Sequence, residues 1–164
     1  GPLSHVLGLQ LNKAAGLDME HAGHKGSPPA LTDVMGGHVP LMFDAMPSSL
    51  PLVKAGKIKA FAVSTPKRSA LLPEVPTFTE LGYPQLQATG WMGLWIKPDV
   101  PAAQQARVRE AALKVLAMPS VRERLQDIGF EPGQPRSPEE LAKSLSADYQ
   151  RMGSVLKSID FKPE

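Results

Sequence analysis

HKGSPPALTDVMGGHVPLMFD, residues 24–44, contains in order a turn, a short helix, a glycine stop and an apolar run. Ser27 is predicted to be the N-cap of the helix, since its hydroxyl can accept a hydrogen bond from a free amide of the first turn. Pro28 follows at the first helical position, where a missing N–H costs nothing. The pair Gly36-Gly37 can adopt the left-handed conformation that ends a helix. The pattern therefore predicts a helix–turn–strand unit.

The segment after the glycine pair is a predicted buried strand, and its end marks a candidate ligand site. Val39–Phe43 is mostly apolar, long enough for a strand and too short for a buried helix. Asp44 is the first polar residue beyond its carboxyl end, the edge at which ligands bind in open α/β sheets. The turn Lys25-Gly26-Ser27 brings backbone amides and the positive end of a helix dipole to that edge, which suits an anion such as a carboxylate.

Short helices alternate with short apolar segments through the first half of the chain. Helices are predicted over residues 4–15 and 47–55, and strands over residues 19–22 and 58–63. This alternation predicts βαβ units and a parallel sheet. An extended segment, residues 88–96, then carries both tryptophans on one face, either to pack in a core or to stack on a ligand.

The last third of the chain is predicted to be helical, over residues 101–117, 120–128 and 137–159, with apolar faces that cover a core. Three capping boxes, in which a Ser or Thr and a Glu satisfy each other's backbone N–H groups, are predicted at Thr77 with Glu80, Ser120 with Glu123, and Ser137 with Glu140.

Composition excludes several classes of function. The 164 residues carry a net charge of +2, and their basic side chains are scattered singly, which does not fit a nucleic-acid interface. The chain has no cysteine and hence no disulfide or thiolate metal site. Its glycines form no phosphate-binding loop, and no serine lies in a nucleophile motif.

The opening stretch also resembles the domain-2 signature of the Bug (Bordetella uptake gene) receptors, the extracytoplasmic solute receptors of tripartite tricarboxylate transporters. The family pattern runs roughly VPYKGxxPALTDLxGGxVxxMFD. The matching positions are Lys25-Gly26, Pro29-Ala30-Leu31-Thr32-Asp33, Gly36-Gly37, Val39, Met42-Phe43-Asp44, Ser49-Leu50-Pro51, Lys67-Arg68-Ser69, Leu72-Pro73-Glu74-Val75-Pro76-Thr77, Glu80 and Trp91-x-Gly93-Leu94. This chain departs from the pattern where Ala22-Gly23-His24 replaces Val-Pro-Tyr.

The resemblance implies an α/β fold, a three-layer αβα lobe of the type II periplasmic-binding-protein kind, with extra C-terminal helices. It implies that residues 1–88 are lobe 2 of the receptor. The first three residues, Gly1-Pro2-Leu3, are typical of a tag scar left by a protease. Residues 89–164 would be the crossing strand and the C-terminal helices that belong to a largely absent lobe 1. The chain is thus expected to be a C-terminal fragment, with the signal peptide upstream of it.

The resemblance further implies a periplasmic solute-binding protein, not an enzyme and without a cofactor. It would capture a small carboxylate, such as a dicarboxylate, a tricarboxylate or an amino acid, for the membrane components of the transporter. Ligand contacts are expected from lobe 2 at Ser4, His24, Lys25, Gly26, Ser27 and Asp44.

Two other classes of function remain open, and one property of the chain itself is expected. A metal enzyme could use His21, His24, His38 and Asp44, although no recognised ligand spacing is present. A sensory or interaction module could report whether solute is bound. With one lobe missing, the chain is expected to bind solute weakly and to self-associate, through strand pairing or by exchange of its C-terminal helices.

Overall fold

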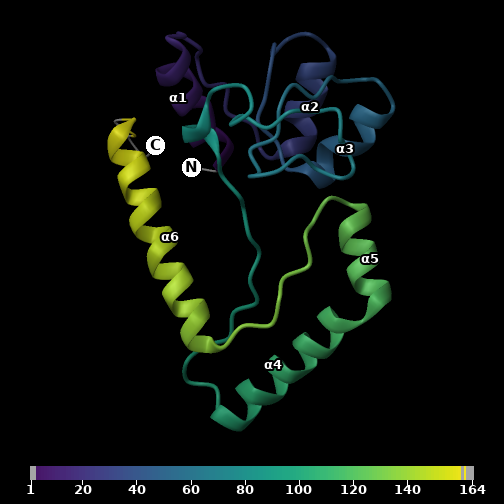
Figure 1. Ribbon diagram of the computed structural model, residues 1–164, viewed down its shortest axis with the longest axis vertical. Coiled ribbons are helices and arrows are strands. Elements are labelled where there is room, and N and C mark those ends of the chain that lie inside the picture. Colours follow the sequence, from purple (N-terminus) through teal and green to yellow (C-terminus); the bar gives the residue numbers. More distant parts are fainter. Residues whose placement is uncertain (1–2, 160, 162–164) are drawn as a thin grey trace.

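The computed structural model describes residues 3–159 and 161. Its elements are, in chain order, α1 (Leu3–Ala15), α2 (Ser27–Met35), α3 (Met46–Lys54), the 3-10 turn η1 (Pro84–Leu86), α4 (Ala102–Ala117), α5 (Pro119–Asp127) and α6 (Pro138–Ser158). Figure 1 shows a body, residues 3–88, that contains α1 to α3 and η1, and an arm, residues 89–159. In the arm, an extended segment leads away from the body to α4, and α5 and α6 run back toward it.

Each long helix predicted from the sequence is present, and the ends of the helices differ from the prediction by about one residue. The capping boxes of Thr77 with Glu80 and of Ser137 with Glu140 are confirmed. The predicted box of Ser120 with Glu123 is wrong, because α5 begins at Pro119 and its N-cap is Met118, without a side-chain cap. A proline at the first helical position has its φ already suited to a helix, so α5 begins one residue earlier. The predicted scar residues Gly1 and Pro2 lie outside the described residues.

The predicted strands are extended segments without a hydrogen-bonded ladder. Among residues 3–159, the structure contains a single β-bridge, a parallel one between Val63 and Thr77. Val63 donates to the Pro76 carbonyl at 2.9 Å, and Phe78 donates to the Val63 carbonyl at 3.1 Å. On the N-terminal side of the bridge, the next bond of a parallel ladder would need an N–H on Pro76, which proline lacks, so the pairing cannot extend in that direction. The predicted burial of the strand at residues 39–43 is also wrong, since Leu41 is 39% exposed.

The hydrophobic core lies entirely in the body as far as the structure is described. One cluster joins α3 to the loop after it, with Leu50, Val63, Leu72 and Val75 buried. A second cluster joins α1 to η1 through Leu7, Leu86 and Ala88, with Phe43 and Phe78 packed against it. The two clusters meet through the short segment of residues 76–78, because Val63 of the first bonds to Phe78 of the second.

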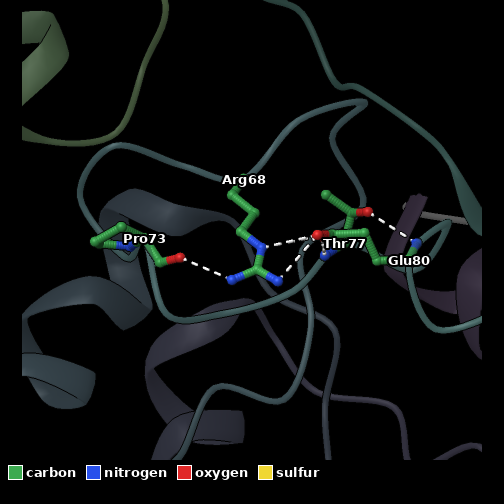
Figure 2. Close-up of polar contacts among 4 residues, drawn as sticks. All are labelled: Arg68, Pro73, Thr77 and Glu80. Carbon is green, nitrogen blue, oxygen red and sulfur yellow. Dashed lines mark hydrogen bonds and ion pairs between the residues drawn. The ribbon is translucent and has the colours of Figure 1, made fainter.

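A carboxylate, that of Glu80, holds the loop of residues 64–80 that connects the two clusters (Figure 2). Arg68 Nε donates to its two oxygens at 3.0 and 3.1 Å, and Arg68 Nη2 lies 2.9 Å from Oε1. The Thr77 amide donates to Glu80 Oε2 at 2.7 Å, and the Glu80 amide donates to the buried Thr77 hydroxyl at 3.1 Å. Arg68 also donates to the Pro73 carbonyl at 3.1 Å. The guanidinium thus ties the middle of the loop to its end.

These donors favour the charged carboxylate. The hydrogen bonds from Arg68 first, and then the one from the Thr77 amide, lower the pKa of Glu80 from 4.5 to about 2. The same carboxylate raises the pKa of the Arg68 guanidinium. The loop is therefore held by a charge-assisted, bidentate pair, which is stronger and more directional than a neutral hydrogen bond.

The arm buries no side chain in α4, α5 or α6. The apolar residues that were predicted to cover a core are exposed, among them Val108, Val115, Leu116, Leu141 and Tyr149. The part of the chain that the structure describes contains no sheet for these faces to cover. Contacts with the body are local: Gly129, just after α5, packs against Met46, and Lys13 Nζ donates to the Ser158 carbonyl at 2.5 Å.

The open arm gives the chain a large surface. Its accessible area is 11920 Å² at 17.6 kDa. A compact monomer of this mass exposes about 7,900 Å², so the excess is about 4,000 Å². None of the described helices has both the length and the apolar composition needed to cross a membrane.

We expect Glu80→Gln to lower the melting temperature at pH 7 and to flatten its dependence on pH. The folded-state pKa of Glu80 is depressed, so the carboxylate stabilises the fold fully above pH 4.5, and this stabilisation is lost as the pH falls toward about 2. Thermal unfolding followed by circular dichroism between pH 2 and pH 7 measures both effects.

Glu110→Gln is the matched control, because Glu110 forms only an exposed i,i+4 pair with Lys114 on α4. A melting curve for Glu80→Gln that matches that of Glu110→Gln across this pH range would show that the loop does not depend on the carboxylate.

Candidate functional site

The N-termini of α2 and α3 meet at the carboxylate of Asp44. Ser27, the first residue of α2, donates its hydroxyl hydrogen bond to Asp44 Oδ1. Ser48, in the first turn of α3, donates to Asp44 Oδ2 at 2.6 Å. Asp44 directly precedes Ala45, the N-cap of α3. Because a helix N-terminus carries a partial positive charge, two such ends favour one negative charge between them.

Asp44 thus has partners within the protein, in a half-buried position. A carboxylate offers about four lone-pair positions, and the two serine hydroxyls occupy one on each oxygen. The remaining positions can still accept a hydrogen bond from an incoming hydroxyl or ammonium group. The geometry is therefore compatible with the predicted role of Asp44 as an acceptor for a ligand.

The beginning of α2 differs from the prediction in its capping. Its N-cap is Gly26, with φ 96°, and no side chain caps the first turn, so the predicted N-cap role of Ser27 is wrong. Its hydroxyl donates to Asp44 in place of accepting from the helix. Pro28 and Pro29 remove two of the N–H groups that a helix start usually presents. Within the described residues, the amides of Gly26 and Ser27 have no hydrogen-bond acceptor, which leaves two adjacent donors.

His24 is held by acceptors on both of its ring nitrogens. Nδ1 lies 2.9 Å from the Ala22 carbonyl, and Nε2 lies 2.8 Å from Asp33 Oδ2. Both nitrogens must carry hydrogen to satisfy these acceptors, which describes the imidazolium form. The hydrogen bond to Asp33, and then the one to Ala22, raise the pKa of His24. Asp33 lies in the last turn of α2, so the ion pair fixes the segment that precedes the helix.

The other predicted ligand residues are less closely linked. Ser4 lies in the first turn of α1, half-buried, and Lys25 is exposed. No described side-chain contact joins either of them to Ser27 or Asp44. The structure therefore brings together Gly26, Ser27 and Asp44 and places His24 just before them.

Two residues of this arrangement were missed from the sequence. Ser48 follows Asp44 by four residues, across the start of a helix, and that spacing was a usable signal for a hydroxyl–carboxylate bond. Asp33 follows His24 by nine residues, and only the folded turn shows that they meet.

The histidines considered as metal ligands lie apart. His21 stacks on His5, with ring centroids 3.7 Å apart and planes 5° from parallel, and His24 pairs with Asp33. His38 packs beside Gly36 at the end of α2. Throughout residues 3–159 and 161, no three His, Asp or Glu side chains are grouped so that they could hold a metal ion.

None of the predicted ligand residues lines either of two cavities on the surface of the described residues. One, of about 470 Å³, lies along α4 beside Pro135. The other, of about 320 Å³, lies between α1 and the end of α6. The candidate site at Asp44 is instead an open surface at two helix ends.

Comparison with known proteins finds a match over nearly the whole chain. Residues 3–161 match the tripartite tricarboxylate transporter family receptor. A protein from the TAR-I ttuE-ttuC' intergenic region of Agrobacterium vitis is 32% identical over 95% of this chain and 46% of its own length. The chain thus spans about half the length of this relative.

Two solved structures superpose on the chain. R. palustris Rpa4515 with adipate has a TM-score of 0.92 and 29% identity, over 100% of this chain and 55% of the other. The periplasmic binding protein BugD has a TM-score of 0.90 and 28% identity, over 98% and 54%. They confirm the α/β fold of the periplasmic-binding-protein kind predicted from the sequence, and the resemblance to the Bug receptors. The helices of that fold are formed here, while its sheet is reduced to one bridge.

We expect Asp44→Asn to destabilise the body by about 1.5–3 kcal/mol, the usual contribution of hydrogen bonds to a charged group. The amide keeps one acceptor oxygen but removes the negative charge between two helix N-termini. Urea unfolding followed by circular dichroism measures the change, with Asp18→Asn, at an exposed position, as the control. Equal unfolding curves for the two variants would contradict a stabilising role for Asp44.

Proposed function

We propose a solute-capturing function for this chain on the premise that it belongs to the tripartite tricarboxylate transporter receptor family, whose match extends over residues 3–161. The protein would be a periplasmic solute-binding receptor that captures a small carboxylate, a dicarboxylate, a tricarboxylate or an amino acid, and delivers it to the membrane components of the transporter. Binding, without catalysis, is the proposed activity. The neighbour solved with adipate, a dicarboxylate, supports this class of ligand.

The observation that carries the proposal is the pair of free amides beside the Asp44 carboxylate. The N–H groups of Gly26 and Ser27 have no acceptor in the described chain, and they lie at the positive end of α2. A carboxylate of the solute would accept from these amides. On a solute that also carries a hydroxyl or ammonium group, such as an amino acid, Asp44 would accept a hydrogen bond from that group.

The remaining predicted residues have supporting roles in this proposal. His24, held by Asp33, would fix the turn that presents the two amides, at the position where the family pattern has tyrosine. Lys25 is an exposed cation next to the amides and would attract an anion. Ser4, at the start of α1, would contribute from a second helix N-terminus.

We also propose that residues 1–88 form lobe 2 of a two-lobe receptor and that residues 89–164 belong to its other lobe. In support of this division, every buried apolar residue of the described chain lies between Val6 and Ala88. The excess surface, about 4,000 Å², is of the size that a second lobe would cover. A solute held on one wall would be weakly bound, because affinity in such receptors comes from both walls of a closed cleft.

We expect the 164-residue chain to bind adipate weakly, with a Kd of about 1 mM or above. Titration of adipate into isotope-labelled chain should shift the amide resonances of Gly26 and Ser27 before those of the arm. Shifts confined to other parts of the chain would contradict the proposed site.

Two variants of Ser27 separate the amide from the hydroxyl. Ser27→Ala keeps the amide N–H and should retain binding, whereas Ser27→Pro removes the N–H at a helix position that accepts proline and should abolish it. Equal binding by both variants would exclude the Ser27 amide as a ligand contact.

A further inference from the structure

The turn that leads into α2 is anchored at both of its ends by side-chain hydrogen bonds. At its end, the Ser27 hydroxyl donates to Asp44. At its beginning, His24 Nε2 lies 2.8 Å from Asp33 Oδ2. Gly26 lies between the two anchors, with a φ of 96° that residues other than glycine rarely adopt. The amides of Gly26 and Ser27, which have no acceptor within the described chain, therefore depend on both contacts for their position.

The His24 contact reaches from the beginning of α2 to its last turn. Residues 27 and 33 are six positions apart in that helix, which corresponds to a rise of about 9 Å along its axis. The His24 side chain therefore extends along α2. Its Nδ1 lies 2.9 Å from the Ala22 carbonyl, so a single ring ties residues 22–24 to the far end of the helix.

The two contacts of the imidazole require a proton on each ring nitrogen. A carbonyl and a carboxylate can only accept hydrogen bonds, and a neutral imidazole has a single N–H. Loss of one proton would place a ring lone pair against either the Ala22 carbonyl or the Asp33 carboxylate, and that contact would be lost. Both contacts exist together only in the imidazolium form, and histidine exchanges this proton near neutral pH.

The groups that face His24 favour the imidazolium. Asp33, on α2, is the charged side chain that contacts the ring, and its hydrogen bond, followed by that of the Ala22 carbonyl, raises the pKa of His24 above 6.5. Lys25, next in the chain, is exposed. His38 is another titratable residue at this end of α2, and its amide donates to the Asp33 carbonyl at 2.9 Å. The ion pair is therefore complete below pH 6.5 and is lost as the pH rises through the raised pKa of His24.

We propose that the ion pair of His24 and Asp33 is a pH-dependent switch that positions the amides of Gly26 and Ser27. With the imidazolium present, residues 22–24 are fixed to α2 and the turn presents its two N–H groups together. With a neutral imidazole, the beginning of the turn is released, while the Ser27 contact with Asp44 keeps its end in place. The effect on binding rests on the proposed function, in which these amides hold a carboxylate of the solute, so affinity should fall as the pH rises.

The first test needs no solute. The isotope-labelled chain is followed by NMR from about pH 5 to about pH 9, on either side of the ordinary histidine pKa. The ring nitrogens of His24 should titrate with a midpoint above 6.5, and the amide resonances of Gly26 and Ser27 should shift with the same midpoint. In Asp33→Asn the midpoint should fall and the amide shifts should shrink, because the ring then titrates without its anchor on α2. Invariant amide resonances, or a His24 midpoint below 6.5, would overturn the proposal.

The second test is the Kd of adipate at about pH 6 and about pH 8.5, where its carboxyl groups, which ordinarily titrate near pH 4, are ionised throughout. The Kd should be about two- to fivefold higher at the upper pH, the range expected for an exposed ion pair. His24→Gln should remove this difference. His38→Gln is the matched control and should keep it, since the His38 side chain is exposed at the other end of α2.

Asp33→Asn separates positioning of the amides from simple attraction between charges. The variant removes a negative charge near the site, which by electrostatics alone would strengthen the binding of a dianion. Loss of the anchor predicts the opposite, a Kd at the lower pH that rises toward the value of the unchanged chain at the upper pH. Circular dichroism shows whether the variant remains folded. Tighter binding of adipate by a folded Asp33→Asn variant would overturn the switch.

The outcomes distinguish the switch from the proposed function. Equal affinity for adipate at both pH values, with shifts at Gly26 and Ser27, would overturn the switch and leave the site intact. Absence of adipate binding at these amides at either pH would contradict the site, and the titration of the free chain would still decide whether His24 positions them. Coincident titration of the ring and the amides, together with weaker binding by Asp33→Asn, is the supporting result.

Discussion

The Glu80 carboxylate is the interaction on which the rest of the body depends. It joins Arg68 to the Thr77 amide, and these two residues bracket the loop that contributes Leu72 and Val75 to one hydrophobic cluster. The segment that follows contributes Phe78 and Leu86 to the other cluster. The other links between the two clusters are the single bridge at Val63 and the hydrogen bonds between Ser64 and Ala88. The ion pair of Arg68 and Glu80 thus holds the two hydrophobic clusters together, although both of its side chains are partly exposed and neither is part of a cluster.

Much of this fold could be predicted from the sequence, because it depends on signals that lie close together. Caps such as Ser137 with Glu140 and Thr77 with Glu80, glycine stops and helical periodicity involve residues three or four apart. The strands could not be predicted in the same way, since a strand exists only where a partner lies beside it. Pro76 ends the single pairing, and only the folded chain shows that it faces Val63.

At the candidate site, too, the features set by neighbouring residues could be predicted, and the contacts between distant residues could not. The sequence indicated that the turn at Gly26 would present amide donors at a helix start. It also indicated that Asp44, at the end of the apolar run, would present an acceptor. It could not show that Ser27 would donate to Asp44, nor that Asp33 would hold His24. Asp33 is also a carboxylate in the last turn of α2, where the helix dipole is unfavourable to it, and the His24 imidazolium compensates for that. A charged group thus lies at each end of α2: Asp44 at its start, and Asp33, paired with His24, in its last turn.

The absence of buried side chains from α4, α5 and α6 means that the chain has two levels of protection against local opening. Helices of 9 to 21 residues that lack tertiary packing are held together mainly by their own backbone bonds, and these are marginal in water. Their amide hydrogens would exchange with solvent through local fluctuations that leave the body intact. The amides of the body would exchange only when its two clusters separate. A partner that covers α4, α5 and α6 would therefore make their unfolding more cooperative, because these helices could then open only after the partner dissociates.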